Sequence, residues 1–516
     1  MGSLTDLTES WKEKWKQDWG WMEKPVLLLF SAYALALLAL IRANYTYADD
    51  LSRSIIGYHG WWDWSRYVTE ALSCLVHMEP RVLDISPIPQ LLAAFLMAVA
   101  GVVVIHSFTA KKEIRPPMLA ATLPMGLSPW FLECFSFKFD APYMALSVLA
   151  SVLPFLWWGK EQKKFYVASF LCVLVMAMTY QASSGIFVIE TLFLAFLDWL
   201  RGKSLKKLFH WIIRSGVVYV AALLLFRIAL MRTPTEEELN YVSVGMLSLQ
   251  DGPTVLWKHM QVYLLTALGD LSLVGKGLCF AVVVDFLLHA WNFTQRNRWF
   301  TMGMLLPFLL LCAILSDGVY LLLKQPLFYP RGMLGMGIFV SFALISYLCV
   351  AGKKMIPSVL VCLIAWHLVT LTAAYGNALA DQKRYTDFRV QLVVQDLNRL
   401  ELNQEQGKTR IHLSGDIGKS QVACSVEEEY PAVKRLIYST FSNDRNFGFY
   451  YFFFYHNLEY SGVHADPAPY MELPVVLENQ YHKIQTDGKD VLVTLKECNW
   501  KESLNLILYN RRKRSL

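Results

Sequence analysis

The sequence has little charge for its length. Only 17% of its 516 residues are Asp, Glu, Lys or Arg, whereas 55% are hydrophobic and 14% are aromatic, and the mean hydropathy is +0.34. This composition is too apolar for a soluble protein of this size, so the chain is predicted to be a multispanning membrane protein. The net charge of +6 is small and no nucleic-acid motif is present, so we expect no nucleic-acid partner.

Motifs for metals and nucleotides are also missing. The nine cysteines include no CxxC pair and no Cys/His spacing typical of a zinc site. There is no glycine-rich phosphate loop, no Rossmann pattern and no DxD-bearing cytoplasmic domain, so a nucleotide pocket is not expected. Cys424 and Cys498 could pair within one extramembrane domain, and their spacing does not decide whether they do.

Long apolar runs dominate what is present. The polar segment 1–24 is not expected to be a signal peptide, because the run after it is long enough to span a membrane. We therefore predict that residues 25–374, a series of apolar runs, form an all-α polytopic membrane domain. About eleven spans of ~20 residues are expected near residues 25–42, 90–108, 118–132, 141–158, 165–181, 185–200, 208–230, 275–293, 299–316, 332–350 and 355–374.

Lys and Arg gather in every second connection between these runs. The positive-inside rule then places the basic connections and the N-terminus in the cytoplasm. The basic connections are 111–115, 160–164, 201–207, 296–298 and 353–354. The segments expected outside are 43–89, 133–140, 231–274, 317–331 and the tail from residue 375.

The tail, residues 375–516, has a different character. The run YTDFRVQLVVQDLNRLELNQ is polar with helical periodicity, and TRIHLSG and DVLVTLKE resemble strands. We predict a small α+β extracytoplasmic domain. The aromatic run FGFYYFFFYH, residues 447–456, is too short to span and is interpreted as part of its core.

The stretch YADDLSRSIIGYHGWWDWSR, residues 47–66, follows the first apolar run. A general base for a hydroxyl needs a shielded acid, with cations nearby to balance phosphate charge. Asp49 and Asp50 supply the acid and Arg53 and Arg66 the cations. Asp50 is preferred as the base because it begins an expected helix, whose N-terminus would hold a carboxylate and keep it ionised. The alternative is a solvated helix cap.

A second charged cluster lies in LSPWFLECFSFKFDAP, residues 127–142, where Glu133, Lys138 and Asp140 stand at an outer turn. Charges at membrane depth cost ~2.5 kcal/mol or more unless they are paired or face a cavity. We therefore favour a role in a cavity over the alternative of a solvated turn.

The third cluster lies in SDGVYLLLKQPLFYPRGM, residues 316–333, with Asp317, Lys324 and Arg331. Lys324 and Arg331 suit a lipid phosphate, Arg through its two-pronged guanidinium and Lys as a point charge. The alternative is snorkelling of both side chains to ordinary lipid.

The order of these motifs resembles a known family. The series runs from the stretch 47–66 through DISPIPQLL, LSPWFLECFSFKFDAPYMALS, TYQAS at 179–183, YPRGM and YGNALADQKRY. In this order and topology it is similar to the phage-type, serotype-converting O-antigen glucosyltransferases, which belong to the GT-C class of polytopic glycosyltransferases. The likeness extends over roughly residues 25–390.

The resemblance implies an enzyme of the bacterial inner membrane that moves a monosaccharide, glucose, from a polyprenyl-phosphate carrier to a cell-surface glycan on the outer leaflet. The catalytic acid would be Asp50 or Asp49. The residues implied for the donor phosphate are Arg331, Lys324, Arg53 and Arg66. The residues implied for the acceptor or the pocket are Glu133, Lys138, Asp140, Tyr180 and Gln181.

The partners implied are the lipid-linked donor, the glycan acceptor, membrane lipid, a flippase and an enzyme that synthesises the donor. GT-C enzymes of this kind often need no metal, although two aspartates beside a phosphate could hold Mg²⁺, and the sequence leaves metal dependence open. A rival function is a transporter or flippase of lipid-linked sugars. Its acids should lie within the spans, and we favour transfer because the predicted spans contain few acids.

Overall fold

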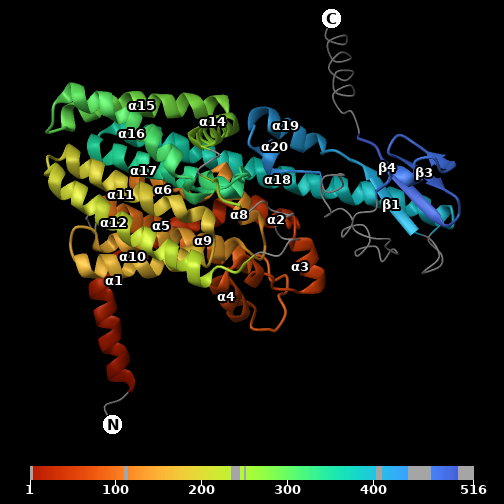
Figure 1. Cartoon of the computed structure of the whole chain (residues 1–516), viewed down its shortest axis with the longest axis horizontal. Helices are drawn as coiled ribbons and strands as arrows, with labels where there is room; N and C mark the ends of the chain where they lie inside the picture. The colour runs from red at the N-terminus through yellow and green to blue at the C-terminus, as the bar shows by residue number, and fades with distance from the viewer. Residues whose placement is uncertain are drawn as a thin grey trace, which may run out of the picture.

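The computed structural model describes residues 4–109, 114–233, 245–248, 252–402, 410–439 and 466–497, with side chains from residue 20 onwards. Long helices run alongside one another through most of the molecule, and a small sheet lies beyond one end of this bundle (Figure 1). Cys498, Lys111, Lys112 and the aromatic run 447–456 lie outside the described residues.

Seven helical segments of the described chain are long and apolar enough to cross a membrane. They are α5 (Ile88–Thr109), η3 with α11 (Gln181–Leu200), α12 with η4 (Leu205–Leu230), α15 (Leu273–Phe293), α16 (Arg298–Leu315), η6 with α17 (Pro330–Ala351) and α18 (Met355–Arg399). The structure agrees with a helical, polytopic membrane protein, while the count of about eleven spans stays a prediction.

The remaining predicted spans do not each correspond to one long apolar helix. The first predicted span crosses from α1 (Leu4–Ala36) into α2 (Leu38–Ala43). The fourth and fifth correspond to α9 (Ala141–Val152) with η2 (Leu153–Trp157) and to α10 (Gln162–Ala177).

The span predicted at 118–132 is three short helices and not one. They are α6 (Pro116–Thr122), α7 (Pro124–Leu127) and α8 (Pro129–Ser136), and each begins with proline. Proline has no N–H to donate and its ring clashes with the preceding turn, so it starts a helix but does not continue one. The chain therefore bends repeatedly here, and α8 delivers Glu133 to one end of the bundle.

The two sets of connections lie at opposite ends of the helices. Arg115 of one basic connection donates to the carbonyl of Gly352 in another at 2.9 Å. At the other end, the Tyr67 hydroxyl donates to the carbonyl of Leu230 at 2.8 Å. This grouping agrees with the alternation in the sequence, and which end faces the cytoplasm stays a prediction.

The segments expected outside contain short helices. The first outer loop holds α3 (Asp50–Ile56), η1 (Trp62–Trp64) and α4 (Tyr67–His77). The later segments hold α14 (Gly252–Asp270), η5 (Gly318–Leu322) and η6 (Pro330–Met333).

A mixed four-stranded sheet packs against the end of α18. Its strands are β1 (Arg410–Gly415), β2 (Val475–Glu478), β3 (His482–Thr486) and β4 (Asp490–Leu495). The order is β1-β4-β3-β2, with β1 parallel to β4 and the other pairs antiparallel. The predicted strands TRIHLSG and DVLVTLKE are β1 and β4, so both are confirmed. A short turn, η7 (Ala468–Tyr470), precedes β2.

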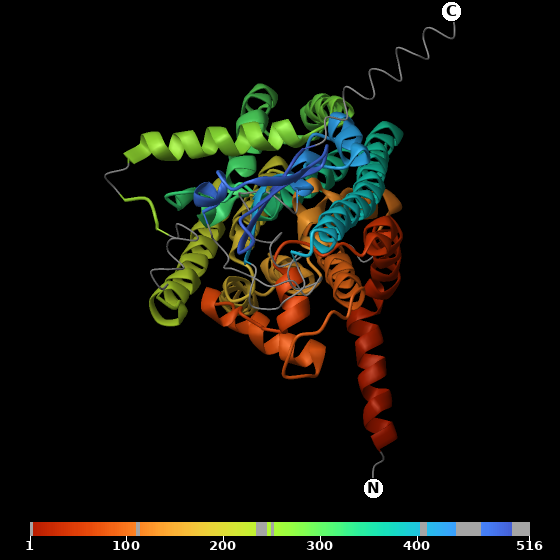
Figure 2. The same cartoon turned by 90° about the vertical axis from the view of Figure 1, so that its right-hand side faces the viewer.

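The helix α18 is continuous over 45 residues, so the predicted boundary at residues 374/375 lies inside it. Buried Arg389 of α18 donates to the carbonyls of Tyr481 and Lys496 at 2.6 and 2.7 Å. Two further helices, α19 (Gln421–Glu429) and α20 (Val433–Leu436), return to the bundle and place Leu436 in its core. Figure 2 shows the sheet in front of the bundle.

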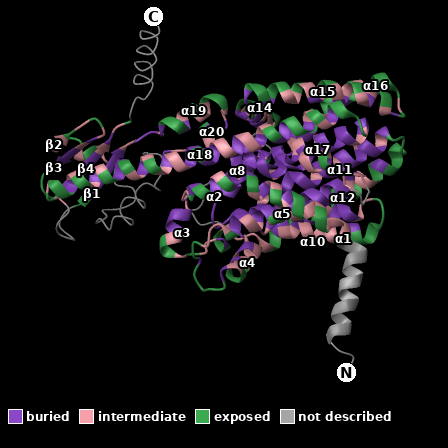
Figure 3. Cartoon of the chain, turned by 180° about the vertical axis from the view of Figure 1, so that it is seen from behind, coloured by how far each residue is buried: buried purple, intermediate pink, exposed green. Residues whose placement is uncertain are grey.

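The bundle has an inner layer and an outer layer of helices (Figure 3). Of an 18-residue apolar stretch in each helix, 67–78% of the residues are buried inside the protein in α5, α11 and α17. The corresponding share is 22–28% in α12, α15 and α16. The inner helices therefore form the core against which the charged loops at one end are packed.

Candidate active site

The first outer loop turns sharply around α3. Asp49 is the N-cap residue of this helix, although its side chain makes no capping hydrogen bond, and Asp50 begins the helix. The helix is followed by Gly57, whose φ of 74° is readily adopted only by glycine. The next residues bring Trp61 back toward the bundle, where its side chain is fully buried. The loop thus folds its charged residues inward.

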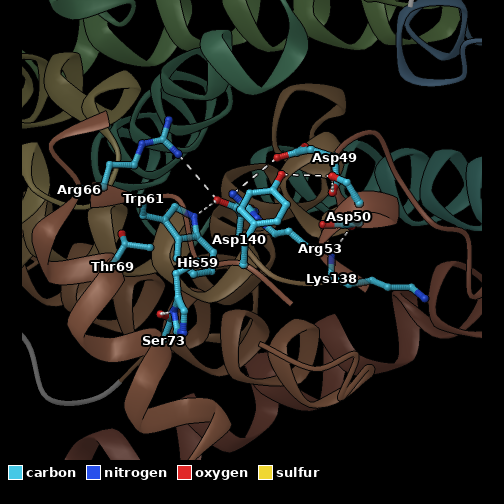
Figure 4. A network of polar contacts seen from close by, with 12 residues as sticks. Asp49, Asp50, Arg53, His59, Trp61, Arg66, Thr69, Ser73, Lys138 and Asp140 are labelled. Atoms are coloured by element: carbon cyan, nitrogen blue, oxygen red, sulfur yellow. Dashed lines mark hydrogen bonds and ion pairs between the residues drawn. The ribbon is translucent and has the colours of Figure 1, made fainter. Parts of the chain in front are cut away.

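Asp140 is the centre of the first group of contacts (Figure 4). Its carboxylate contacts the guanidinium of Arg53, accepts a hydrogen bond from Trp61 Nε1 at 2.6 Å, and lies 3.7 Å from Nη1 of Arg66. Burial raises the pKa of Asp140, but the charges of Arg53 and Arg66 outweigh it and hold that pKa below its ordinary value. Asp140 is therefore an ionised carboxylate that holds Arg53, Trp61 and Arg66 of the first outer loop together.

Asp50 and Asp49 have different surroundings. Asp50 is fully buried, its Oδ2 accepts the backbone N–H of Lys138 at 2.7 Å, and no described residue donates to its Oδ1. The Asp49 side chain is 38% exposed, with Oδ2 3.6 Å from Nη2 of Arg53. The two acids therefore point into different environments, and the interpretation of Asp50 as a solvated helix cap is wrong.

Asp50 is not kept ionised by its helix. Burial, followed by the charge of Asp49, raises the pKa of Asp50 well above its ordinary value. The short helix α3 offsets desolvation too little, because an N-terminus contributes typically only ~0.3–1 kcal/mol. Burial thus favours the protonated form of Asp50, and this part of the expectation is corrected.

Glu133 and Arg331 form a second group. The Arg331 backbone N–H donates to Glu133 Oε2 at 2.7 Å, and its Nη1 lies 3.5 Å from Oε1. The guanidinium lies 4.8 Å from the ring centroid of Phe137. The Glu133 side chain is only 6% exposed, whereas that of Arg331 is 36% exposed, so Arg331 retains an accessible face.

Tyr180 joins the two groups. The guanidinium of Arg66 lies 4.8 Å from the ring centroid of Tyr180, whose hydroxyl donates to the carbonyl of Arg331 at 3.4 Å. Four segments therefore meet at one end of the bundle, as the motif order implied: 47–66, 127–142, 179–183 and 329–333.

Lys138 is held separately from the arginines. Its Nζ donates to Asp84 Oδ2 at 2.7 Å, and the Lys138 side chain is 4% exposed. Glu133, Lys138 and Asp140 are all buried, so the interpretation of this segment as a solvated turn is wrong.

Two predicted residues make none of these contacts. The Lys324 side chain is exposed, and its backbone N–H donates to the carbonyl of Gly245 at 2.7 Å. Gln181 is half-buried at the start of η3 beside Tyr180, and it has no hydrogen bond to the charged residues within the described ranges.

Trp61 and Asp84 were missed by the sequence reasoning, although both lie in quoted motifs or loops. Trp61 reaches Asp140 across 79 positions of the chain, and Asp84 reaches Lys138 across 54. The sequence signals that could have identified them were the acid of Asp84 and the indole N–H of Trp61, because both stand in the first outer loop.

The aspartate pair does not fit the Mg²⁺ site that the sequence left open. Asp50 is buried and bonded to a backbone N–H, while Asp49 is partly exposed beside Arg53. Among the described residues, no group of three or more His, Cys, Asp or Glu side chains could hold a metal ion.

Comparison with known proteins agrees with the resemblance. A family model described as "Glucosyl transferase GtrII" matches residues 38–342, more than half of the chain and all of the contacts around Asp140 and Glu133. An "Uncharacterized 55.3 kDa protein in gtrB 5'region" of Salmonella phage P22 is 21% identical over 416 residues, which cover 77% of this chain and 83% of that protein. No solved structure is significantly similar. The chain therefore belongs to the Glucosyl transferase GtrII family.

Proposed function

We propose that the chain transfers glucose from a polyprenyl-phosphate carrier to a surface glycan, the O-antigen, at the outer face of the bacterial inner membrane. Membership of a glucosyl transferase family supports the transferred sugar. The observation that carries the site is the gathering of buried acids at one end of an apolar bundle, with Arg53 buried among them and Arg66 and Arg331 partly exposed beside them. Such charges are expensive at membrane depth unless they are paired or face a cavity, so a cluster of them is a candidate functional site.

In the proposed reaction, the acceptor hydroxyl attacks the anomeric carbon of the donor. The bond from that carbon to the phosphate oxygen breaks, and the polyprenyl phosphate leaves with the bonding electrons. The acceptor proton passes to a carboxylate of the protein. The reaction therefore needs cations at the leaving phosphate and a base on the acceptor side.

Arg66 and Arg331 are best suited to the phosphate. Their side chains are 20% and 36% exposed, so each guanidinium keeps donors free of its carboxylate partner. Arg53 is only 6% exposed and is engaged by Asp140. We assign Arg53 to positioning of the loop, and Lys324 to attraction of the anionic headgroup from outside.

Asp50 remains the first choice for the base and Asp49 the second. Lys138 fixes one oxygen of Asp50 and leaves Oδ1 without a partner among the described residues. A raised pKa makes Asp50 a stronger base once its proton has left. Release of that proton would accompany entry of the substrates.

The rival function, transport of lipid-linked sugars, has one observation in its favour. Glu190 of α11 is fully buried within a span, and its Oε1 accepts a hydrogen bond from Ser107 at 2.8 Å. The spans thus contain at least one acid of the kind that a transporter uses.

Reconstituted protein distinguishes the two functions. Vesicles would carry polyprenyl-phosphate glucose labelled in the sugar, with O-antigen on one side. We expect label in the glycan and none with nucleotide-linked glucose as donor. Movement of labelled lipid between leaflets without label in the glycan would establish transport and overturn the proposal.

A further inference from the structure

Asp317 is a buried acid that the proposed reaction has not yet used. It follows α16 at the same end of the bundle as Arg66 and Arg331, and it is 0% exposed. No residue in the described parts of the chain donates a hydrogen bond to its Oδ1 or Oδ2. A buried carboxyl group normally has such donors, so both oxygens are free to accept from a bound molecule.

The backbone around Asp317 is clamped. A Cβ on Gly185 of α11 would lie 2.3 Å from the carbonyl oxygen of Ser316, and a Cβ on Gly335 of α17 would lie 1.9 Å from the same atom. Further along the same segment, the Val319 N–H donates to Oγ of Ser184, also in α11, at 3.0 Å. The segment is therefore wedged between the first turns of two core helices, and Asp317 is held in place before any ligand arrives.

The side chain of Tyr320 lies between Asp317 and the Arg331 segment. Tyr320 lies three residues after Asp317 in the chain, and a Cβ placed on Gly332, the residue after Arg331, would lie 3.8 Å from Cδ2 of its ring. Tyr320 is only half-buried. A half-exposed ring between Asp317 and the Arg331 segment is a surface on which a sugar can rest.

The identity of the bound groups follows from charge. Burial raises the pKa of Asp317 well above its ordinary value. An ionised Asp317 would repel the donor phosphate, and a protonated one would offer it a single O–H where the arginines offer charged donors. Sugar hydroxyls are neutral donors, and a carboxyl group can accept from two of them at once.

We propose that Asp317 binds hydroxyl groups of the glucosyl unit of the donor and so selects the sugar, while Arg66 and Arg331 bind the phosphate. This inference rests on the proposed function and assigns a specificity role within the same site. Arg66 and Arg331 thus bind the phosphate of the carrier, whereas Asp317 binds the sugar that the carrier bears.

The test uses donors in which fluorine replaces one hydroxyl. Fluorine keeps the size of the hydroxyl but cannot donate a hydrogen bond, and the hydroxyl next to the anomeric carbon is left intact. With the full-length protein in nanodiscs, we expect kcat/KM to fall ~10²-fold or more for at least one such donor, because an unpaired buried acceptor rejects the analogue. Asp317→Ala should transfer glucose slowly. Replacing glucose by the same fluorinated analogue should lower the kcat/KM of this variant by less than about a further 3-fold.

The matched control is Asp63→Asn, an acid of the first outer loop whose side chain is 53% exposed. It should keep the discrimination of the unmodified protein. If Asp317→Ala lowers the rate equally for all donors and keeps the full discrimination, or if it only lowers the unfolding temperature, Asp317 is structural and the inference fails. If Asp317→Ala does not fold, the same comparison is made with Asp317→Asn, which retains one acceptor oxygen. An unmodified protein that transfers no glucose from the lipid donor contradicts the proposed function itself.

Discussion

The two ends of the helical bundle carry the same kinds of charged residue in different surroundings. At one end, Lys164 and Glu161 lie 2.8 Å apart with 62% and 53% of their side chains exposed. At the other, Arg53 and Asp140 contact each other with 6% and 7% exposed. Exposed pairs contribute ~0–1 kcal/mol to stability, whereas a buried charge left without its partner costs ~3–5 kcal/mol. Burial, more than charge content, therefore distinguishes the end that carries the candidate site.

The largest effect concerns which end faces outward. Alkaline phosphatase fused to the C-terminus should be active in cells, and a fluorescent protein at the same point should be dark, because the tail is predicted to lie outside the cytoplasm. A bright fluorescent fusion with an inactive phosphatase would place the tail in the cytoplasm and reverse the predicted orientation of the two ends of the bundle.

Asp140→Ala should destabilise the protein by ~3–5 kcal/mol, because it leaves the Arg53 guanidinium buried without its carboxylate. The measurement is thermal or denaturant unfolding in detergent. The folded-state pKa of Asp140 is depressed, so its contribution is present above the unfolded pKa of ~3.9 and is lost as the pH falls through the lower folded value. Equal stability of the mutant and the parent at pH 7 would contradict the buried pair.

Arg331→Ala should raise the apparent KM for the lipid-linked donor by ~30-fold or abolish turnover, since loss of one partner in a desolvated charge pair costs ~2–5 kcal/mol. Arg331→Lys should recover part of the loss, because it restores charge without the two-pronged geometry. Initial rates over a range of donor concentrations decide this, and unchanged donor kinetics would remove Arg331 from the site.

Asp50→Asn should lower turnover by ~10²-fold or more, because the amide cannot take the acceptor proton. The folded pKa of Asp50 is raised, so its contribution to stability is present below the unfolded pKa of ~3.9 and declines as the pH rises toward the folded value. The mutant should therefore be at least as stable as the parent at pH 7. Near-normal turnover on purified protein would transfer the role to Asp49.

The smallest effect is expected at the opposite end. Glu161→Gln removes the exposed partner of Lys164 and should change the unfolding free energy by less than ~0.5 kcal/mol, with turnover unchanged. A change as large as that of Asp140→Ala would show that exposure does not separate the two ends.

The class of fold could be predicted from the sequence because hydropathy is a local property. The grouping of basic loops and the strands β1 and β4 were predictable for the same reason. The break at α6–α8 was visible in Pro116, Pro124 and Pro129, but a count of apolar residues does not register proline.

The contacts of the site were less predictable because they join distant segments. The motifs named Asp140 and Arg331, but their partners lie 74 (Arg66 to Asp140) to 198 (Glu133 to Arg331) positions away along the chain. The pKa of Asp50 was predicted in the wrong direction because desolvation depends on how the other loops cover it. Asp317 was noted only as one end of a charged segment, and its isolation from donors appears only once α11 and α17 are packed around it.

The unbroken helix α18 sets the distance between the helical bundle and the sheet. At ~1.5 Å per residue its 45 residues extend about 68 Å, of which a bilayer core takes ~30 Å. The remainder sets a fixed height for the sheet above the membrane and also a fixed angular phase, because each residue turns the helix by ~100°. Removal of one residue beyond the bilayer would rotate the sheet around the helix axis, whereas removal of seven would lower it by ~10 Å and nearly restore its direction.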